Sequence, residues 1–153
     1  MKVVSLVPSI TEALFDLGLT KNEVIGRTKF CIHPSEKVKN VPIIGGTKNI
    51  NIEKIKALQP DLILANKEEN VKEQVEALMT DFKVVVTNVE NVEDNYYLLK
   101  TLGKLFNKEE KAQCFNLKIY DVLNEAKINS SIKVAYLIWK NPYMTIGSDT
   151  FID

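Results

Sequence analysis

Residues 3–18 read VVSLVPSITEALFDLG, and this stretch decides the fold because a strand runs directly into a helix. Val3–Val7 is a mostly β-branched run, typical of a strand that is buried on both faces. Pro8 ends the strand, and Ser9 with Glu12 predicts a capping box at the start of the helix. Such a junction presents free backbone donors at the carboxyl edge of a sheet, where open α/β sheets bind ligands.

The length and composition are typical of one folded domain without a strongly charged face. The chain has 153 residues, of which 45% are hydrophobic, and its 20 basic residues balance 20 acidic ones. A net charge near zero argues against a nucleic-acid-binding protein. No run of about 18 apolar residues predicts a membrane span. Cys31 and Cys114 lie in separate predicted elements, which favours two buried thiols over a disulfide.

The alternation of strands and helices continues through the first 106 residues. Further extended runs are predicted at residues 23–26, 41–44, 61–65 and 83–87. Three helices follow typical N-cap residues, which are Asn51, Asn70 (paired with Glu73) and Asn91. Because the connections are too long for hairpins, they indicate a mostly parallel sheet covered by helices. The predicted fold class is therefore α/β, with a Rossmann-like lobe over residues 1–106.

A long helix changes this pattern. Residues 108–127 carry apolar side chains at helical spacing, which predicts a helix of about 20 residues and about 30 Å. We assign residues 107–129 to a connecting helix and residues 130–153 to the beginning of a second α/β lobe. One or two strands cannot bury themselves, so we expect this lobe to be incomplete and its edge to favour self-association. The elements expected in it are strands at 133–139 and 143–147 and a helix start at 148–152.

Groups that could carry out catalysis are scarce. His33 is the only histidine, which excludes a multi-histidine metal site, and no G-x-S-x-G elbow supplies a serine nucleophile. Gly45–Lys48 contains glycines and a lysine, but the spacing fits no phosphate-binding loop. We therefore predict a protein that is not an enzyme and that holds no metal or cofactor of its own.

The loops that follow the predicted strands form a candidate binding surface. Because the carboxyl ends of parallel strands meet at one edge of a sheet, we expect these loops to gather there. They offer an aromatic ring, hydroxyl and amide groups, and several cations, which favours non-covalent recognition of a sizeable polar or anionic ligand. The segments are Pro8-Ser9, Thr28 to Cys31, Gly46 to Lys48 and Asn66-Lys67.

An ordered series of motifs resembles one protein family. The motifs are VSLVPSITE at 4–12, GRT at 26–28, IGG at 44–46, NIEKI at 51–55, LQPDLI at 58–63 and WKNPYMT at 139–145. They resemble the mature start of periplasmic solute-binding proteins of the helical-backbone class. These proteins serve ABC importers of cobalamin, ferric siderophores and haem, and the cobalamin-binding branch is the most similar. The resemblance covers essentially all 153 residues.

The resemblance implies two α/β lobes joined by one rigid helix, with the ligand in the cleft between them. It implies a location in the periplasm or at the membrane surface. Because the first predicted strand begins at residue 3, no signal peptide is predicted and a cytoplasmic location stays open. Glu53 would contact arginines of the permease subunit. The implied ligand-binding residues are Pro8, Ser9, Phe30, Gly46, Thr47, Lys48, Asn66, Lys67, Trp139 and Tyr143.

The expected ligand is a metal chelate, either a cobalamin-like corrinoid or a ferric siderophore. Phe30 lies where the cobalamin-binding proteins hold an aromatic ring against the ligand, which favours a corrinoid. Thr47 and Asn66 lie where those proteins have tryptophans, so stacking area for a planar ring is lost. The cations available for a ferric chelate are Arg27, Lys29, Lys48 and Lys67.

Two other functions stay open at this point. One is a cytoplasmic α/β enzyme or nucleotide- or metabolite-binding domain, and the other is a chain that self-associates and binds no small ligand tightly.

Overall fold

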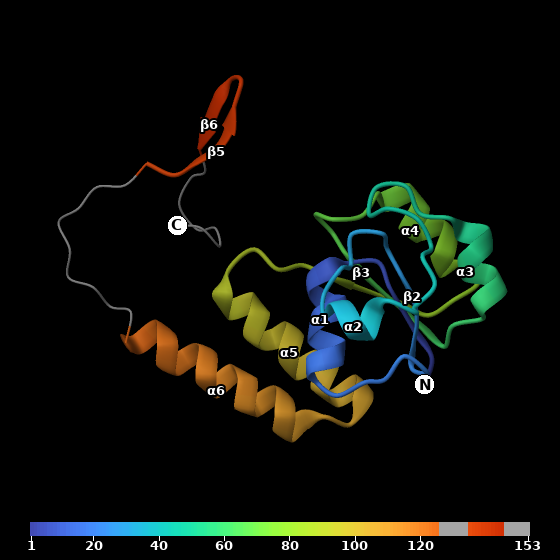
Figure 1. Cartoon of the computed structure of the whole chain (residues 1–153), viewed down its shortest axis with the longest axis horizontal. Coiled ribbons are helices and arrows are strands. Elements are labelled where there is room, and N and C mark those ends of the chain that lie inside the picture. Colours follow the sequence, from blue (N-terminus) through green and yellow to red (C-terminus); the bar gives the residue numbers. More distant parts are fainter. Residues whose placement is uncertain (126–134, 146–153) are drawn as a thin grey trace.

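The computed structural model describes residues 1–125 and 135–145 (Figure 1). The N-terminal part contains a four-stranded sheet in the order β2-β1-β3-β4, and every pair in it is parallel. This arrangement confirms the α/β class with a parallel sheet. The strands are β1 (Val3–Ser5), β2 (Val24–Arg27), β3 (Leu62–Asn66) and β4 (Val84–Thr87).

Helices cover both faces of the sheet. Right-handed connections place α1 on one face and α3 and α4 on the other, because the chain moves from β1 to β2 in one direction and from β2 to β3 and β4 in the opposite one. The helices are α1 (Pro8–Asp16), α2 (Ser35–Val38), α3 (Ile52–Leu58), α4 (Lys72–Met79), α5 (Val92–Phe106) and α6 (Glu109–Glu125).

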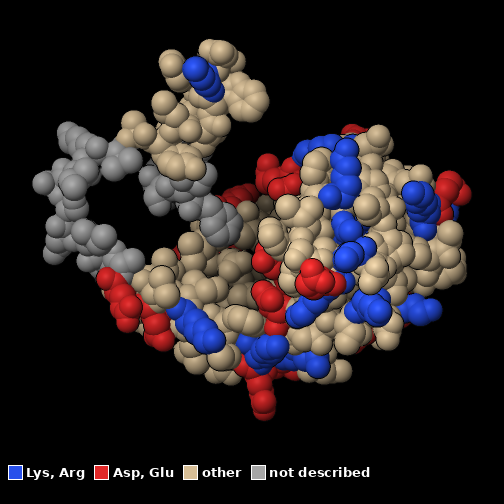
Figure 2. Space-filling model, viewed as in Figure 1, with Lys and Arg blue, Asp and Glu red and all other residues tan. Residues whose placement is uncertain are grey.

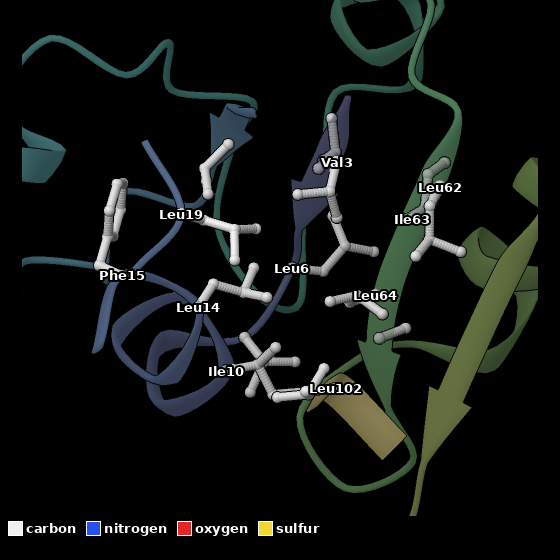
Figure 3. Packing of buried hydrophobic residues seen from close by; sticks show 14 of the residues in the cluster. Val3, Leu6, Ile10, Leu14, Phe15, Leu19, Leu62, Ile63, Leu64 and Leu102 are labelled. Atoms are coloured by element: carbon white, nitrogen blue, oxygen red, sulfur yellow. The ribbon is translucent and has the colours of Figure 1, made fainter. Parts of the chain in front are cut away.

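The hydrophobic core lies between the central strands and the helices. All five residues of β3 and all three of β1 are buried, as expected for strands that are covered on both faces. Figure 3 shows Ile10 of α1 beside Leu102 of α5, where the two helices meet over the sheet. β4 is only half-buried and forms one edge of the sheet. The brief extended run predicted at 41–44 pairs with the end of β2 through an isolated bridge between Ile43 and Arg27, but it forms no full strand.

The predicted capping box at the start of α1 is wrong. The helix begins one residue earlier, with Val7 as the N-cap and Pro8 in the first turn, and no side chain caps it. Pro8 favours this start because it needs no hydrogen-bond acceptor and its φ is already helical. Ser9 is therefore inside the helix and exposed, and the Thr11 hydroxyl donates to the Val7 carbonyl oxygen over 2.9 Å.

Two of the three predicted asparagine caps are confirmed. The Asn51 side chain accepts a hydrogen bond from the Lys54 amide at the start of α3, and the Asn91 side chain accepts one from the Asp94 amide at the start of α5. The cap predicted at Asn70 is wrong, because α4 begins at Lys72 with Val71 as its N-cap. The Asn70 side chain is buried and used elsewhere.

The long helix is confirmed as α6, which packs against α5. Gly103 allows this approach, since a Cβ atom there would lie 2.8 Å from the Cβ of Ala112. Phe115 and Ile119 pack against the core, as their helical spacing predicts. The division into a lobe at 1–106, a connecting helix at 107–129 and a second lobe at 130–153 stays a prediction.

The second described part is a small antiparallel hairpin. It consists of β5 (Leu137–Lys140) and β6 (Tyr143–Thr145), and every residue of both strands is exposed. The start of the strand expected at 133–139, the end of the one expected at 143–147 and the helix start at 148–152 lie outside the described residues.

The two cysteines differ in their exposure to solvent. Both cysteines are free, but only Cys31 is buried, so the predicted burial of Cys114 is wrong. Within residues 1–125 and 135–145, no helix is long and apolar enough to cross a membrane.

Candidate functional site

The candidate site lies at the carboxyl edge of the parallel sheet. β1 and β3 are neighbours, but the chain leaves β1 toward β2 on one side and reaches β3 on the other. This reversal makes the space between β1 and β3 a topological switch point, where open α/β sheets bind ligands. The loops after β1, β2 and β3 and the loop at residues 45–50 meet around it.

The loop after β2 presents Phe30 to solvent. The residue is 51% exposed, and the Lys29 ammonium nitrogen lies 5.0 Å from the centroid of its ring, a cation–π contact. The next residue, Cys31, is fully buried, and its sulfur lies 3.1 Å from the hydroxyl oxygens of both Thr11 and Thr28. A buried polar cluster therefore anchors the loop while its aromatic ring stays accessible.

The Arg27 side chain also stabilises the loop after β2. Its Nε donates to the Val38 carbonyl oxygen over 2.9 Å, and its Nη1 donates to the Cys31 carbonyl oxygen over 3.1 Å. The side chain is 8% exposed. Arg27, which the sequence offered as a cation for the ligand, is therefore engaged inside the protein.

The loop at residues 45–50 forms the adjacent part of the rim. Gly45 has a φ of +119°, and a Cβ atom there would lie 2.5 Å from the Asn49 carbonyl oxygen, so the turn requires glycine. A Cβ atom at Gly46 would lie 3.4 Å from Cε2 of Phe30, which places the two residues side by side. Thr47 is 8% exposed, whereas Lys48 is exposed and its ammonium group donates to the Glu68 carbonyl oxygen.

The loop after β3 contains Asn66 and Lys67. The Asn66 side chain is 8% exposed, and its Oδ1 accepts hydrogen bonds from the amides of Glu68 (2.9 Å) and Glu69 (3.2 Å). Its Nδ2 donates to the Thr87 hydroxyl over 3.2 Å. The carboxamide thus mainly shapes the loop, and Lys67 is the exposed member of the pair.

A hollow of about 390 Å³ opens at this edge of the sheet. Ser9 and Asn66, both predicted from the sequence, line it together with residues that the sequence reasoning missed. Thr87 and Val89 follow β4 and reach the same edge, so the rule applied to the other strands could have found them. The missed residues are Val7, Ile10, Glu68, Glu69, Thr87, Val89, Asn95 and Leu98.

Three other residues predicted to bind the ligand do not line this hollow; they are Pro8, Trp139 and Tyr143. Pro8 is half-buried at the start of α1, beside Ser9. Trp139 and Tyr143 lie together on the hairpin, 64% and 70% exposed, and the hollow that they line is bounded by hairpin residues. Their predicted place across a cleft from Phe30 stays a prediction.

Glu53 lies in the first turn of α3 and is exposed. It lines a shallow hollow with Asn49 and Ile50, next to the loop at residues 45–50. Its side chain is therefore accessible to solvent beside that loop.

Three basic side chains of the rim are exposed, namely Lys29, Lys48 and Lys67. Figure 2 shows Lys and Arg side chains gathered in a band on the visible face of the N-terminal lobe. The groups with clearly shifted pKa values, Glu23 and Lys56, lie outside the rim. Over the described ranges, no group of three or more His, Cys, Asp or Glu side chains could hold a metal ion.

A family profile described as periplasmic binding protein matches residues 3–152, nearly the whole chain. The chain belongs to the periplasmic binding protein family. The family consists of substrate-binding proteins of transport systems, which agrees with the prediction of a non-enzyme and does not favour the alternative of a cytoplasmic enzyme.

Individual relatives agree with this assignment. The chain is 31% identical over 165 residues to an uncharacterized ABC transporter substrate-binding lipoprotein, YvrC, of Bacillus subtilis (strain 168), covering 99% of this chain and 51% of that protein. It is 28% identical over 151 residues to the vitamin B12-binding protein of Salmonella choleraesuis (strain SC-B67), covering 95% of this chain and 55% of the relative. The chain thus spans about half the length of the curated relatives it matches.

Solved structures support the same fold. The structure of S. aureus IsdE complexed with heme matches with a TM-score of 0.83 at 20% sequence identity, covering 99% of this chain and 60% of the other. At this identity, the match shows the fold alone.

Proposed function

We propose that this chain provides the N-terminal lobe and connecting helix of the substrate-binding component of an ABC importer. In this role it binds a metal chelate, a cobalamin-like corrinoid or a ferric siderophore, and delivers it to the permease. The observation that carries the proposal is that Phe30 and residues 45–50 pack together and form one rim at the switch point of the sheet. In a member of the periplasmic binding protein family, this edge is the natural place for a ligand.

The chemistry of the rim fits a large ligand with an apolar face and a charged edge. Phe30 is 51% exposed, and it packs beside Gly46, where a side chain would crowd the ring. Lys29, Lys48 and Lys67 are exposed around it and would attract carboxylate or phosphate groups. The vitamin B12-binding relative supports the corrinoid, and the three lysines support an anionic ferric chelate.

The proposal includes two contacts beyond the N-terminal lobe. Glu53 would pair with arginines of the permease, since it is exposed on the first turn of α3. Trp139 and Tyr143 would contact the ligand from the second lobe, since both expose large aromatic surfaces. This role places the protein in the periplasm or at the outer surface of the cell membrane.

A ligand panel read by thermal shift tests the proposal. The protein, at the full length that its gene encodes, is incubated with cyanocobalamin, ferrichrome or haem. A ligand at 100 times its dissociation constant should add about 2.7 kcal/mol of stability. A shift with cyanocobalamin or ferrichrome that is reduced in Phe30→Ala would support the proposal. The absence of any shift at millimolar corrinoid and siderophore would contradict it.

A further inference from the structure

Two amide side chains, one just before α4 and one in its first turn, hydrogen-bond to the main chain of the loop at residues 45–50. We propose that Asn70 and Gln74 are positioning residues that fix this loop and thereby set the shape of the ligand-binding rim. The consequence for the ligand rests on the proposed function, but the effect on the loop does not. Neither residue was predicted to have this role, and Asn70 was predicted to be a helix cap.

Asn70 joins three segments that are distant in the sequence. Its Nδ2 donates to the Leu6 carbonyl oxygen over 3.2 Å and to the Thr47 carbonyl oxygen over 3.0 Å. Its Oδ1 accepts a hydrogen bond from the Asn66 amide over 2.9 Å. The side chain is 7% exposed, so water cannot readily replace these bonds. Asn70 therefore connects the loops after β1 and β3 to the loop at residues 45–50.

Gln74, four residues further along the chain, binds the same loop at residues 45–50. Its Oε1 accepts a hydrogen bond from the Ile50 amide over 3.1 Å, and its Nε2 donates to the Lys48 carbonyl oxygen over 3.3 Å. Asn70 precedes α4 and Gln74 lies in its first turn, and both side chains reach the main chain of the same loop. Together they bind backbone groups of three loop residues, Thr47, Lys48 and Ile50.

The need for such support follows from the shape of the loop. Its ends are held together by an isolated bridge between Gly45 and Ile50, and the Gly46 amide donates to the Asn49 carbonyl oxygen. These bonds close the loop upon itself but do not attach it to the strands of the switch point. The loop is attached to its neighbours by the Lys29–Gly45 and Lys48–Glu68 hydrogen bonds and by the Asn70 and Gln74 side chains. Asn70 is the link to the ends of β1 and β3, so the position of Thr47 at the rim depends on it.

Two conservative substitutions of Gln74 distinguish the contributions of its two hydrogen bonds. In Gln74→Glu, a carboxylate oxygen can still accept from the Ile50 amide, but the donor to Lys48 is lost. In Gln74→Met, both bonds are lost at similar side-chain size. Gln113→Met on α6 is the matched control, because Gln113 is an exposed helical glutamine outside the site.

Amide hydrogen exchange provides a test that needs no ligand. We expect the Ile50 amide to exchange about tenfold faster in Gln74→Met than in the wild type, and close to the wild-type rate in Gln74→Glu. The Ile63 amide in β3 should be unaffected in all variants. Equal exchange at Ile50 in Gln74→Met, Gln113→Met and the wild type would overturn the proposal.

Ligand affinity tests whether the loop position matters for binding. The measurement uses the protein at the full length that its gene encodes, with cyanocobalamin and ferrichrome as probes. We expect Gln74→Met to weaken binding by about tenfold with a melting temperature within about 3 °C of the wild type. Unchanged affinity despite faster exchange at Ile50 would overturn the role in shaping the rim. A wild-type protein that binds neither probe would contradict the proposed function, and hydrogen exchange alone would then decide whether the two residues hold the loop.

Discussion

The main-chain amide of Lys29 donates a hydrogen bond to the carbonyl oxygen of Gly45, with 2.8 Å between the nitrogen and the oxygen. This bond joins the loop after β2 to the loop at residues 45–50. It places Phe30 against Gly46, so that two short segments form one continuous surface. A change in either loop should therefore alter the other.

We expect Gly45→Ala to destabilise the protein by about 2–3 kcal/mol. The residue has a φ of +119°, and the added Cβ would lie 2.5 Å from the Asn49 carbonyl oxygen, so the turn must open. Urea unfolding of the variant measures the loss. Gly46→Ala is the control, because its Cβ would meet Phe30 at 3.4 Å, a distance that a small movement of the ring can relieve. An equal loss in both variants would show that backbone strain at Gly45 is not the cause.

Phe30→Ala should weaken ligand binding by at least about tenfold while changing the free energy of unfolding by less than about 1 kcal/mol. The ring is 51% exposed, so it contributes little to the core, but it is the aromatic surface of the rim. Isothermal titration with the ligand found in the panel measures the affinity. Tyr97→Ala on α5 is the matched control, since Tyr97 is 69% exposed. If both variants bind equally well, Phe30 does not contact the ligand.

Glu53→Arg should abolish most ligand uptake by cells without changing the affinity of the isolated protein for the ligand. The reversed charge would repel the permease arginines that the proposed function places opposite it. The loss of an acid in the first turn of α3 should cost only about 0.3–1 kcal/mol of stability. Glu73→Arg, an exposed acid in the first turn of α4, is the control. Normal uptake in Glu53→Arg would exclude the docking role.

Glu23→Gln should destabilise the protein near neutral pH but have little effect near pH 3. The Thr20 amide donates to the Glu23 carboxylate over 2.8 Å, and chiefly for this reason the pKa of Glu23 is below its ordinary value of 4.5. A lowered pKa in the folded state gives stability that is present above the ordinary pKa and is lost as the pH falls through the lowered one. Because Glu23 is partly accessible to solvent, we expect a difference of at most about 1 kcal/mol.

Urea unfolding of the wild type and of Glu23→Gln at about pH 7 and about pH 3 measures this dependence. Thr20 also donates its hydroxyl to the same carboxylate oxygen over 2.9 Å, so Thr20→Val serves as a partial variant with a smaller effect. A stability difference of the same size at both pH values would mean that the charge of Glu23 contributes nothing.

Much of the fold was predictable because its signals are local. The buried strand at β1, the caps at Asn51 and Asn91 and the long helix after residue 107 each follow from neighbouring residues in the sequence. The start of α1 was mispredicted because Pro8 and Ser9 give competing signals, and proline at the first helical position prevailed.

The candidate site was predictable in its location but less so in the roles of its residues. Parallel strands bring their carboxyl ends to one edge, so the loops containing Phe30, Gly46 and Lys67 could be grouped in advance. Arg27 was expected to face a ligand, but it is buried and donates to main-chain carbonyl oxygens. Asn66 accepts hydrogen bonds from main-chain amides and also lines the hollow. A side chain with several hydrogen-bonding atoms serves either purpose, and its sequence position does not show which.

The sequence by itself therefore determined the parallel α/β sheet with its helices, the long helix and the edge at which the loops after the strands gather, because hydrophobic periodicity and the alternation of strands and helices are local patterns. Only the tertiary structure decided how the rim is built. The contacts of Asn70 with Leu6 and Thr47 and of Lys29 with Gly45 join residues that are distant in the chain. Such contacts exist only after the sheet has formed, since folding must first bring the loops together.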